Sequence, residues 1–333
     1  MEDENNFTLS GDINGPLLAA VISIEMIGGL IANSFVLILT ICHIKTWKQP
    51  STIFLTNMLI SNLLIVLFVM PFAITTAASG EWLFGKTDKQ KVKACQFTAF
   101  MFWFCVIVIT EGLVLLSFDR FFYIVKSFEY ERHMNRKISI IIVTLSWLLA
   151  ALLTIPPLFG LGRFGFSSSY GICVPRWEGE PGYVVYMLIV FIIFLLSIII
   201  TSSWTMIYTR RYLNMERQRL QLFDVNNDGN TNDIYASRKR RVIGLFGMIM
   251  IVHLLCYLPS MIVALMELVT APPPQLYATI FLLFLLLTVL SPLVQSFFRR
   301  DIRGTVVKLT GWCSEVAKLF NKKYTRIASS SEN

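Results

Sequence analysis

The chain has 333 residues, of which 55% are hydrophobic and only 15% are charged, and its mean hydropathy is +0.63. Soluble domains carry about 25% charged residues, so this composition favours a membrane protein and argues against an ordinary soluble domain. The net charge of +8 would suggest a nucleic-acid partner for a soluble protein. In a membrane protein it predicts basic cytosolic loops, and we expect no nucleic-acid partner.

The cysteines and histidines do not indicate a metal or redox site. The six cysteines are too few for a disulfide-dense framework and lack zinc-binding spacing. The three histidines are scattered, and no set of residues suggests a catalytic centre. We therefore expect no metal, no cofactor and no enzymatic activity.

Residues 1–16 form a polar, acidic segment without Lys or Arg. A secretory signal peptide begins with basic residues, so this segment is not expected to be one. Asn6-Phe7-Thr8 is a sequon for N-glycosylation, and Asn6 can be modified only if this end faces outside.

Seven apolar runs follow, each long enough to cross a hydrocarbon core as a helix. They cover residues 17–42, 53–78, 94–125, 138–159, 183–208, 242–270 and 276–298. Lipid offers no partner for an open strand edge, so all seven are expected to be helices. The chain shows no internal repeat, which argues against an inverted-repeat transporter. The sequence therefore predicts an all-α membrane protein, with a seven-transmembrane helix bundle over residues 17–298.

The basic residues predict the orientation of the bundle. Most of the 29 Lys and Arg lie in the connections 43–52, 126–137 and 209–241 and in the tail after residue 298. Cytosolic loops carry excess Lys and Arg, so these segments are expected inside and the N-terminus outside. The cluster 86–93 of the outer face is a local exception. We expect a multi-pass protein of the plasma membrane with a cytoplasmic C-terminus.

Asp119 and Arg120 lie side by side at the cytosolic end of the third run. Ionisable groups at a membrane boundary are costly to desolvate, and Arg cannot lose its charge. The pair is therefore either an anchor at the water interface or a switch that holds and releases a contact. These two residues alone leave both interpretations open.

Two cysteines are expected on the outer face, Cys95 at the top of the third run and Cys173 in the loop 160–182. That compartment is oxidising, so a disulfide between them is the natural pairing, and it would tether the loop across the mouth of the bundle. The cysteines within the runs are expected to pack in apolar surroundings.

The cytosolic segments after the fifth and seventh runs differ in character. Residues 209–241 contain an Asp- and Asn-rich stretch and are expected to form a solvated loop. In the tail, 299–333, apolar residues recur at helical spacing between basic ones from Arg299 to Trp312. This pattern predicts a short helix lying against membrane lipid, with Cys313 as a candidate palmitoylation site.

Motifs in six of the seven runs together resemble the rhodopsin-like (class A) family of G-protein-coupled receptors, of the orphan type. Each motif lies in the run where the family has it. They are Asn33 in Gly28-Gly-Leu-Ile-Ala-Asn-Ser-Phe-Val36, Asn62 in Leu59-Ile-Ser-Asn-Leu-Leu64, Asp119-Arg120-Phe121, Trp147, Cys256-Tyr257-Leu-Pro259, and Ser291-Pro292-Leu-Val-Gln295.

The resemblance implies ligand-coupled signalling to a heterotrimeric G protein. In the family the Asp-Arg pair restrains the closed cytosolic end, and outward motion of the sixth helix opens a cleft for the G protein. The resemblance therefore favours the switch interpretation. The residues that it assigns to coupling and switching are Asp119, Arg120, Phe121, Cys256, Tyr257, Pro259, Ser291 and Pro292, with Asn33, Asn62 and Trp147 as core polar positions. Pro259 and Pro292 are expected to kink their helices because proline lacks a backbone donor.

Several positions depart from the family pattern. Asn62 replaces an acidic residue and Ile109 a serine of the family's sodium pocket, so sodium dependence is expected to be weak. The family's sixth-helix Phe and Trp are His253 and Tyr257 here, and its seventh-helix Asn and Tyr are Ser291 and Gln295. Because these departures fall on the switch, a basally active receptor and a non-signalling decoy of the same fold both remain open.

The ligand cavity is expected among the outer halves of the third, sixth and seventh helices. Its candidate residues are Phe102, Trp103, Val106, Tyr257, Ser260, Met261, Tyr277 and Phe281, for each of which simple bundle packing is the alternative. Phe102 stands where an amine-binding Asp would be, and the run 276–298 has no Lys for a retinal Schiff base. The extracellular ligand is therefore expected to be a lipid, a small apolar molecule or the hydrophobic end of a peptide.

A seven-helix transporter or channel is the less favoured alternative. It would need a polar line through the bundle. The candidates are Glu25, Asn62, Glu111 and His253, and they lie at scattered depths.

Overall fold

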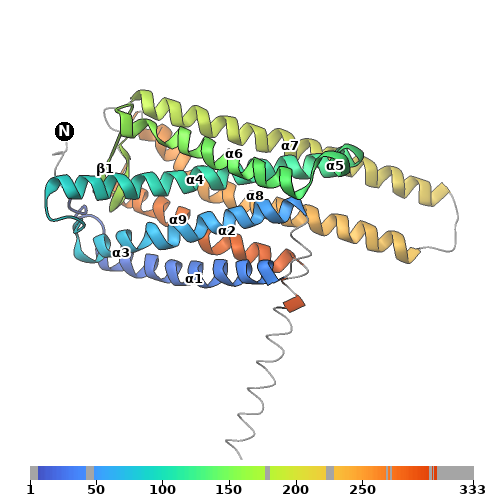
Figure 1. Ribbon diagram of the computed structural model, residues 1–333, viewed down its shortest axis with the longest axis horizontal. Helices are drawn as coiled ribbons and strands as arrows, with labels where there is room; N and C mark the ends of the chain where they lie inside the picture. The colour runs from blue at the N-terminus through green and yellow to red at the C-terminus, as the bar shows by residue number, and fades with distance from the viewer. Residues whose placement is uncertain are drawn as a thin grey trace, which may run out of the picture.

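The computed structural model describes residues 7–42, 49–176, 181–222, 229–267, 269–270, 272–299, 302 and 304–305. Long helices run side by side along one axis, and a small hairpin lies at one end (Figure 1). Within the described residues, seven helical spans are long and apolar enough to cross a membrane. The helices are α1 (Gly15–Cys42), α2 (Pro50–Phe68), α3 (Met70–Ser79), α4 (Asp88–Val125), α5 (Ser127–His133), α6 (Arg136–Thr154), α7 (Pro181–Leu222), α8 (Gly229–Glu267) and α9 (Pro274–Phe298), and η2 (Pro156–Phe159) is a short 3-10 helix.

The second predicted run, residues 53–78, forms two consecutive helices in the structure. α2 ends at Phe68 and α3 begins at Met70, with Val69 between them outside helical geometry. Pro71 explains the break, because proline has no backbone donor and its ring clashes with the carbonyl four residues earlier. Together α2 and α3 form one membrane span, Pro50–Ser79.

The segment 209–241, expected as a loop, is largely helical. α7 continues to Leu222 and α8 begins at Gly229, so both helices extend beyond the rest of the bundle (Figure 1). The extension of α7 is rich in Arg, Leu, Met and Gln, which are strong helix formers. Local propensity therefore continues the helices past the apolar runs.

The loop 160–182 contains a β-hairpin, which the all-α prediction missed. β1 (Arg163–Ser167) pairs antiparallel with β2 (Ile172–Arg176), and Phe166 lies opposite Cys173. The ban on open strand edges applies within the hydrocarbon region, and this hairpin lies beyond the spans. We call this end of the bundle the hairpin end.

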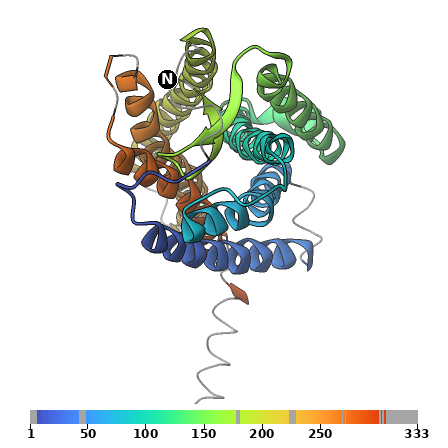
Figure 2. The ribbon, with the colours of Figure 1, turned by 90° about the vertical axis from the view of Figure 1, so that its left-hand side faces the viewer.

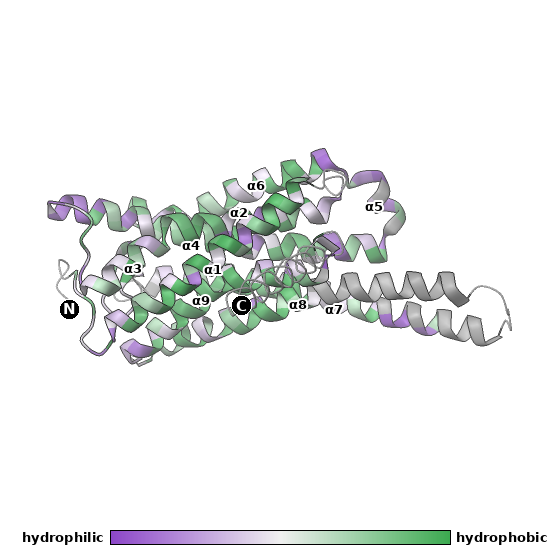
Figure 3. Ribbon diagram, turned by 90° about the horizontal axis from the view of Figure 1, so that it is seen from below, coloured by the Kyte–Doolittle hydropathy of each residue, from purple (hydrophilic) through white to green (hydrophobic). Residues whose placement is uncertain are grey.

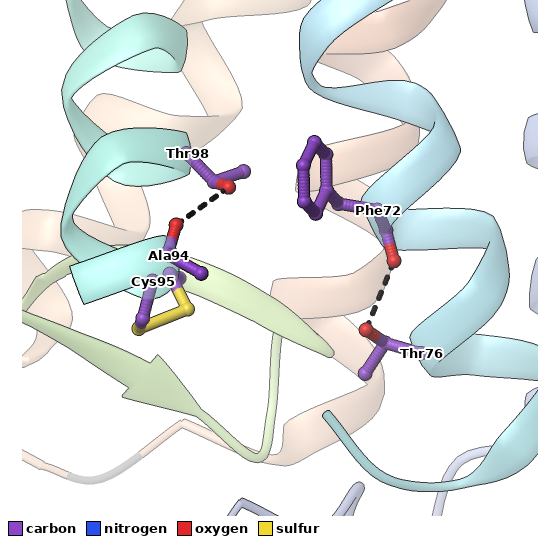
Figure 4. The surroundings of a disulfide bond; sticks show 6 residues. Phe72, Thr76, Ala94, Cys95 and Thr98 are labelled. Atoms are coloured by element: carbon purple, nitrogen blue, oxygen red, sulfur yellow. Dashed lines mark hydrogen bonds between the residues drawn. A yellow bond between two sulfur atoms is a disulfide. The ribbon is translucent and has the colours of Figure 1, made fainter. Parts of the chain in front are cut away.

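The predicted disulfide between Cys95 and Cys173 is confirmed. It joins the first turns of α4 to β2, with α3 alongside (Figure 4). Nearby, the Thr98 hydroxyl donates to the carbonyl of Ala94 and the Thr76 hydroxyl to that of Phe72. These hydroxyls are satisfied within their own helices, so their burial around the disulfide carries no unpaired donor.

Residues 7–14, which we call the N-terminal strap, cross the hairpin end (Figure 2). The amide of Trp82 donates to the carbonyl of Phe7 at 2.9 Å, and the amide of Ser10 donates to the carbonyl of Ser168 at 3.1 Å. The Phe7 ring is buried, and its centroid lies 6.0 Å from that of Phe166. The strap is therefore fastened to both the α3–α4 connection and the hairpin.

Apolar side chains dominate the middle of the bundle, and polar side chains gather toward its ends (Figure 3). The core packs α4 against α2, α6 and α7, and α1 against α3 and α9. Within the spans many apolar side chains are exposed, as expected of surfaces that face lipid.

Three predicted features lie wholly or partly outside the described residues. Asn6 of the sequon and Cys313 of the candidate palmitoylation site are not described. Of the predicted tail helix, Arg299, Ile302, Gly304 and Thr305 are described; Arg299 is not helical, and the other three are. The domain limits 1–16, 17–298 and 299–333 stay predictions.

Candidate functional site

Asp119 and Arg120 form an ion pair at the end of the bundle opposite the hairpin. The Arg120 Nε donates to Asp119 Oδ2 at 3.0 Å. The Asp119 side chain is fully buried, so it needs partners for both oxygens. The second oxygen accepts from the hydroxyl of Tyr130 at 2.7 Å. The Arg120 guanidinium also lies over the Tyr123 ring, with its carbon 5.1 Å from the ring centroid.

Tyr130 was not singled out from the sequence. It lies on α5, a short helix that begins directly after α4, and this turn brings it back against Asp119. Burial, followed by the nearby negative charge of Asp119, raises the pKa of Tyr130 above its ordinary value. The hydroxyl is therefore protonated and acts as the donor. The sequence offers only a Tyr eleven residues after Asp119, and this spacing does not predict a hydrogen bond between the two side chains.

Phe121 faces away from this ion pair. Its ring contacts Trp204 of α7 edge to face, with centroids 6.2 Å apart, and its neighbour Phe122 at 5.5 Å. This ring contact joins α4 to α7 next to the Asp119–Arg120 pair.

The predicted core polar residues occupy two separate contacts. Asn33 donates to the carbonyls of Gly29 and Thr288 at 2.7 and 2.6 Å, and it accepts from Asn62 at 3.3 Å. These bonds join α1, α2 and α9. The indole of Trp147 instead donates to Asn57, joining α6 to α2. Asn57 was missed because it lacks a motif of its own, although a buried Asn in an apolar run indicates such a contact.

A cavity of about 420 Å³ runs along the bundle between α4, α7, α8 and α9. It is lined by Tyr170 and Val174 near the hairpin end, by Tyr257 in its middle and by Arg120 at the opposite end. Most of its surface is apolar. One internal space therefore reaches from beneath the hairpin to the ion pair.

Six of the eight predicted ligand residues line this cavity. They are Phe102, Trp103, Tyr257, Ser260, Met261 and Phe281. Val106 does not line the cavity; its side chain is buried in the hydrophobic core of the bundle. Tyr277 does not line it either, because its ring packs on Tyr170, with centroids 5.1 Å apart, in a cluster with Val263 and Ile280. Both side chains pack against other residues of the protein rather than facing the internal space.

The remaining switch candidates are spread over α8 and α9. Cys256 is buried, and the Tyr257 ring lies between His253 and Phe284, with centroids 5.9 and 5.1 Å away. Pro259 and Pro292 lie inside their helices. Ser291 and Gln295 are buried, and their side-chain polar atoms make no hydrogen bond within the described structure. The structure brings Tyr257 to the cavity, but Ser291 and Gln295 lie apart from it.

Hydroxyl and imidazole groups that the sequence did not assign to a shared site also meet in this region. Ser117 of α4 hydrogen-bonds with Thr201 and Ser202 of α7, and the Ser202 hydroxyl lies 3.1 Å from the sulfur of Met250 in α8. His253 of α8 lies close by on the cavity wall. Ser and Thr in apolar helices usually bond their own backbone, so the sequence does not predict these contacts between helices.

Comparisons with known proteins agree with this architecture. The model of the family described as 7 transmembrane receptor (rhodopsin family) matches residues 32–295. The chain is 32% identical to 5-hydroxytryptamine receptor 7 of Xenopus laevis over 46% of its length, and 25% identical to G-protein coupled receptor 161 of Mus musculus over 55%. It is 28% identical to the high-affinity lysophosphatidic acid receptor of Xenopus laevis over 43%. The chain spans about a third of the length of these relatives: 35%, 32% and 36%.

Proposed function

Because the chain belongs to the rhodopsin family of seven-transmembrane receptors, whose members are not enzymes, we propose that it passes an extracellular ligand signal to a heterotrimeric G protein through Arg120. The observation that carries this proposal is the cavity. The same space is lined by the ligand candidates Phe102 and Tyr257 and by Arg120 near the opposite end. A ligand and a G protein would therefore act on one set of helices.

The proposed mechanism is a shift between two packings of the bundle. In the closed state Asp119 holds Arg120, and Tyr130 holds Asp119. The cavity separates α8 from α4 and α7 over much of their length. A ligand that contacts Tyr257 more favourably in one position of α8 would shift the population toward that position, and the end near Arg120 would open.

The orientation follows the same reasoning. The Cys95–Cys173 disulfide requires an oxidising compartment, and the basic connections lie at the other end. We therefore place the hairpin end and N-terminus outside the plasma membrane and the ion pair in the cytoplasm.

The ligand is expected to be apolar rather than cationic. Phe102 lines the cavity where an amine ligand would need a carboxylate, and Arg120 is the only lining residue with a fixed charge in the described part of the chain. Among the relatives, names such as 5-hydroxytryptamine receptor and lysophosphatidic acid receptor refer to those proteins' own ligands.

The test compares wild-type receptor with Arg120→Ala at matched surface levels in a G-protein dissociation assay covering every G-protein class. Loss of a charge-assisted interface contact costs about 2 kcal/mol, so coupling by Arg120→Ala is expected to fall roughly 30-fold. Arg132→Ala is the matched control, because Arg132 is an exposed Arg of α5. Equal coupling by wild type and Arg120→Ala would contradict the proposed route. A complete lack of coupling by wild type would instead support the non-signalling decoy.

A further inference from the structure

We propose that the cavity binds a neutral, elongated apolar molecule bearing a hydroxyl group, which arrives from the bilayer between α7 and α8 and donates a hydrogen bond to His253. This inference rests on the proposed function, since it names the ligand class and the route for the receptor's own cavity. It assigns a polar subsite one turn deeper than Tyr257, on residues that the ligand prediction did not include.

The lateral opening is inferred from residues that line the cavity and yet leave more than two fifths of their surface exposed. Ile199 of α7 is 48% exposed, and Leu254 and Leu258 of α8 are 43% and 45% exposed. All three lie within membrane spans. The contact between Ser202 and Met250 joins α7 to α8 on the Arg120 side of these residues. The cavity therefore opens toward lipid between α7 and α8, at the depth of His253.

The hairpin end offers a poorer route because several segments cover it. The hairpin lies over the bundle, fastened by the disulfide to α4, and the N-terminal strap crosses it (Figure 2). The strap bonds to the α3–α4 connection through Phe7 and Leu9, and Gln275 of α9 donates to the carbonyl of Asp12 at 3.2 Å. Tyr170 of the hairpin turn also packs on Tyr277 of α9. A ligand from the aqueous side would have to displace these contacts.

His253 supplies the polar recognition. It is 2% exposed, lines the cavity, and places Nδ1 2.8 Å from the carbonyl of Ile249. A carbonyl only accepts, so Nδ1 carries the proton and Nε2 of the neutral ring is an acceptor. Nε2 makes no hydrogen bond within the described structure. A buried acceptor without a partner is costly, so a ligand that donates a hydrogen bond there gains that energy.

The lining also selects against charged ligands. Among the described residues of the lining, Arg120 is the only fixed charge, and its guanidinium is already held by Asp119. An amine would meet no carboxylate among these described side chains, and an acid at the depth of His253 would meet an acceptor rather than a donor. Burying either charge unpaired is strongly unfavourable, whereas a single hydroxyl needs one acceptor.

The experiment uses a long-chain alcohol with a diazirine at mid-chain as a photolabel on the full-length receptor in nanodiscs, without any G protein. Matched probes carry a methyl ether, a carboxylic acid or an amine in place of the hydroxyl. Mass spectrometry measures labelling of the α7 and α8 peptides that line the cavity. We expect the alcohol to label them about fivefold more than the ether, the size of effect that one neutral hydrogen bond produces. In His253→Phe this preference is expected to vanish.

The route is tested by the rate of labelling. Ile199→Trp is expected to slow it several-fold, whereas Ile193→Trp, at an exposed position of α7 outside the cavity, leaves it unchanged. Phe7→Ala loosens the strap and is expected to leave the rate unchanged.

Five results would overturn the proposal: equal labelling by alcohol and ether in wild type, a preference for the acid or amine, a preference that survives in His253→Phe, an unchanged labelling rate in Ile199→Trp, or faster labelling in Phe7→Ala. If His253→Phe does not fold, the probe comparison in wild type and the Ile199→Trp rate still decide it. Because no G protein is present, failure here is distinct from failure of the coupling test.

Discussion

At the scale of single residues, the ion pair of Asp119 and Arg120 depends on a third residue. Asp119 is fully buried, and without Tyr130 its carboxylate oxygen Oδ1 would lose the hydroxyl that donates a hydrogen bond to it. Hydrogen bonds to buried charged groups contribute about 1.5–3 kcal/mol. Tyr130 therefore stabilises the closed arrangement from a separate short helix, α5.

Tyr130→Phe is expected to lower the thermal unfolding midpoint of the purified receptor, because it leaves an oxygen of the Asp119 carboxylate without its donor. The loss is expected to be about 2 kcal/mol. Basal coupling is expected to rise in the same variant, since Asp119 is then less firmly placed against Arg120. Tyr123→Phe is the control, because Tyr123 is half exposed and Arg120 contacts its ring rather than its hydroxyl. Equal midpoints for both variants would argue against a role for the Tyr130 hydroxyl.

We expect Asn62 and Ile109 to weaken the response to sodium. The amide of Asn62 donates to Asn33, and the buried side chain of Ile109 has no oxygen to offer a cation. Hard cations need oxygen ligands, preferably charged ones. The hydrogen-bonded pair of Asn62 and Asn33 therefore provides no negative charge to bind a sodium ion.

We expect the unfolding midpoint of the wild-type receptor to be the same in NaCl and in KCl at equal ionic strength. The double variant Asn62→Asp/Ile109→Ser restores a carboxylate and a hydroxyl, and it is expected to be more stable in NaCl than in KCl. A sodium-specific shift in wild type would show that another site binds the ion.

At the scale of helices, close approach depends on small residues. A Cβ on Gly29 would lie 2.8 Å from the Thr288 hydroxyl oxygen and 3.1 Å from a methyl of Val66, where α1 meets α9 and α2. A Cβ on the neighbouring Gly28 would meet only Val289, at 3.6 Å. The lack of a side chain at Gly29 therefore allows α1, α2 and α9 to approach closely at the level where Asn33 makes its hydrogen bonds. A methyl group at Gly28 would not prevent this approach.

Gly29→Ala is expected to destabilise the receptor by about 1–3 kcal/mol, the usual cost of overpacking a tight contact. Gly28→Ala has room for its methyl group and gains helix propensity, so it is expected to be neutral or stabilising by up to about 1 kcal/mol. Thermal unfolding of the two adjacent variants gives the comparison. Similar losses of stability in the two variants would mean that the close helix packing at Gly29 is not what makes Gly29→Ala destabilising.

At the scale of the whole molecule, the disulfide closes a long loop that includes much of α4 and all of α6. Cys95 and Cys173 are 78 residues apart, and the bond fixes the hairpin over the end of the bundle. In the chain-entropy view, closing a loop of this length stabilises the fold by about 4 kcal/mol. The bond therefore stabilises the hairpin end as a unit together with the strap.

Cys95→Ser and Cys173→Ser are each expected to lower surface expression strongly, and the double variant is expected to match the single ones because all three lose the same bond. Flow cytometry of intact cells measures it. Cys42→Ser is the control, because Cys42 is an exposed free cysteine. Normal expression of either single variant would contradict a stabilising role for the bond.

The sequence by itself determined the seven spans, their expected orientation and the apolar character of the residues expected to line a ligand cavity. These properties depend on transfer free energies and charge counts that each segment carries on its own. The disulfide was also predictable, because Cys95 and Cys173 were the two cysteines expected on the outer face. The helical extensions of α7 and α8 were missed because hydropathy marks where lipid ends, not where a helix ends.

Only the tertiary structure decided which side chains meet. The bond from Trp147 to Asn57 and the cavity join segments far apart in the chain. The bond from Tyr130 to Asp119 and the hairpin are more local, but each depends on how the chain turns back on itself. An apolar residue on a membrane helix has the same local pattern whether it faces lipid, a neighbouring helix or an internal space. Val106 and Tyr277 do not line the cavity for this reason, since packing, rather than residue type, selects the side chains that face it.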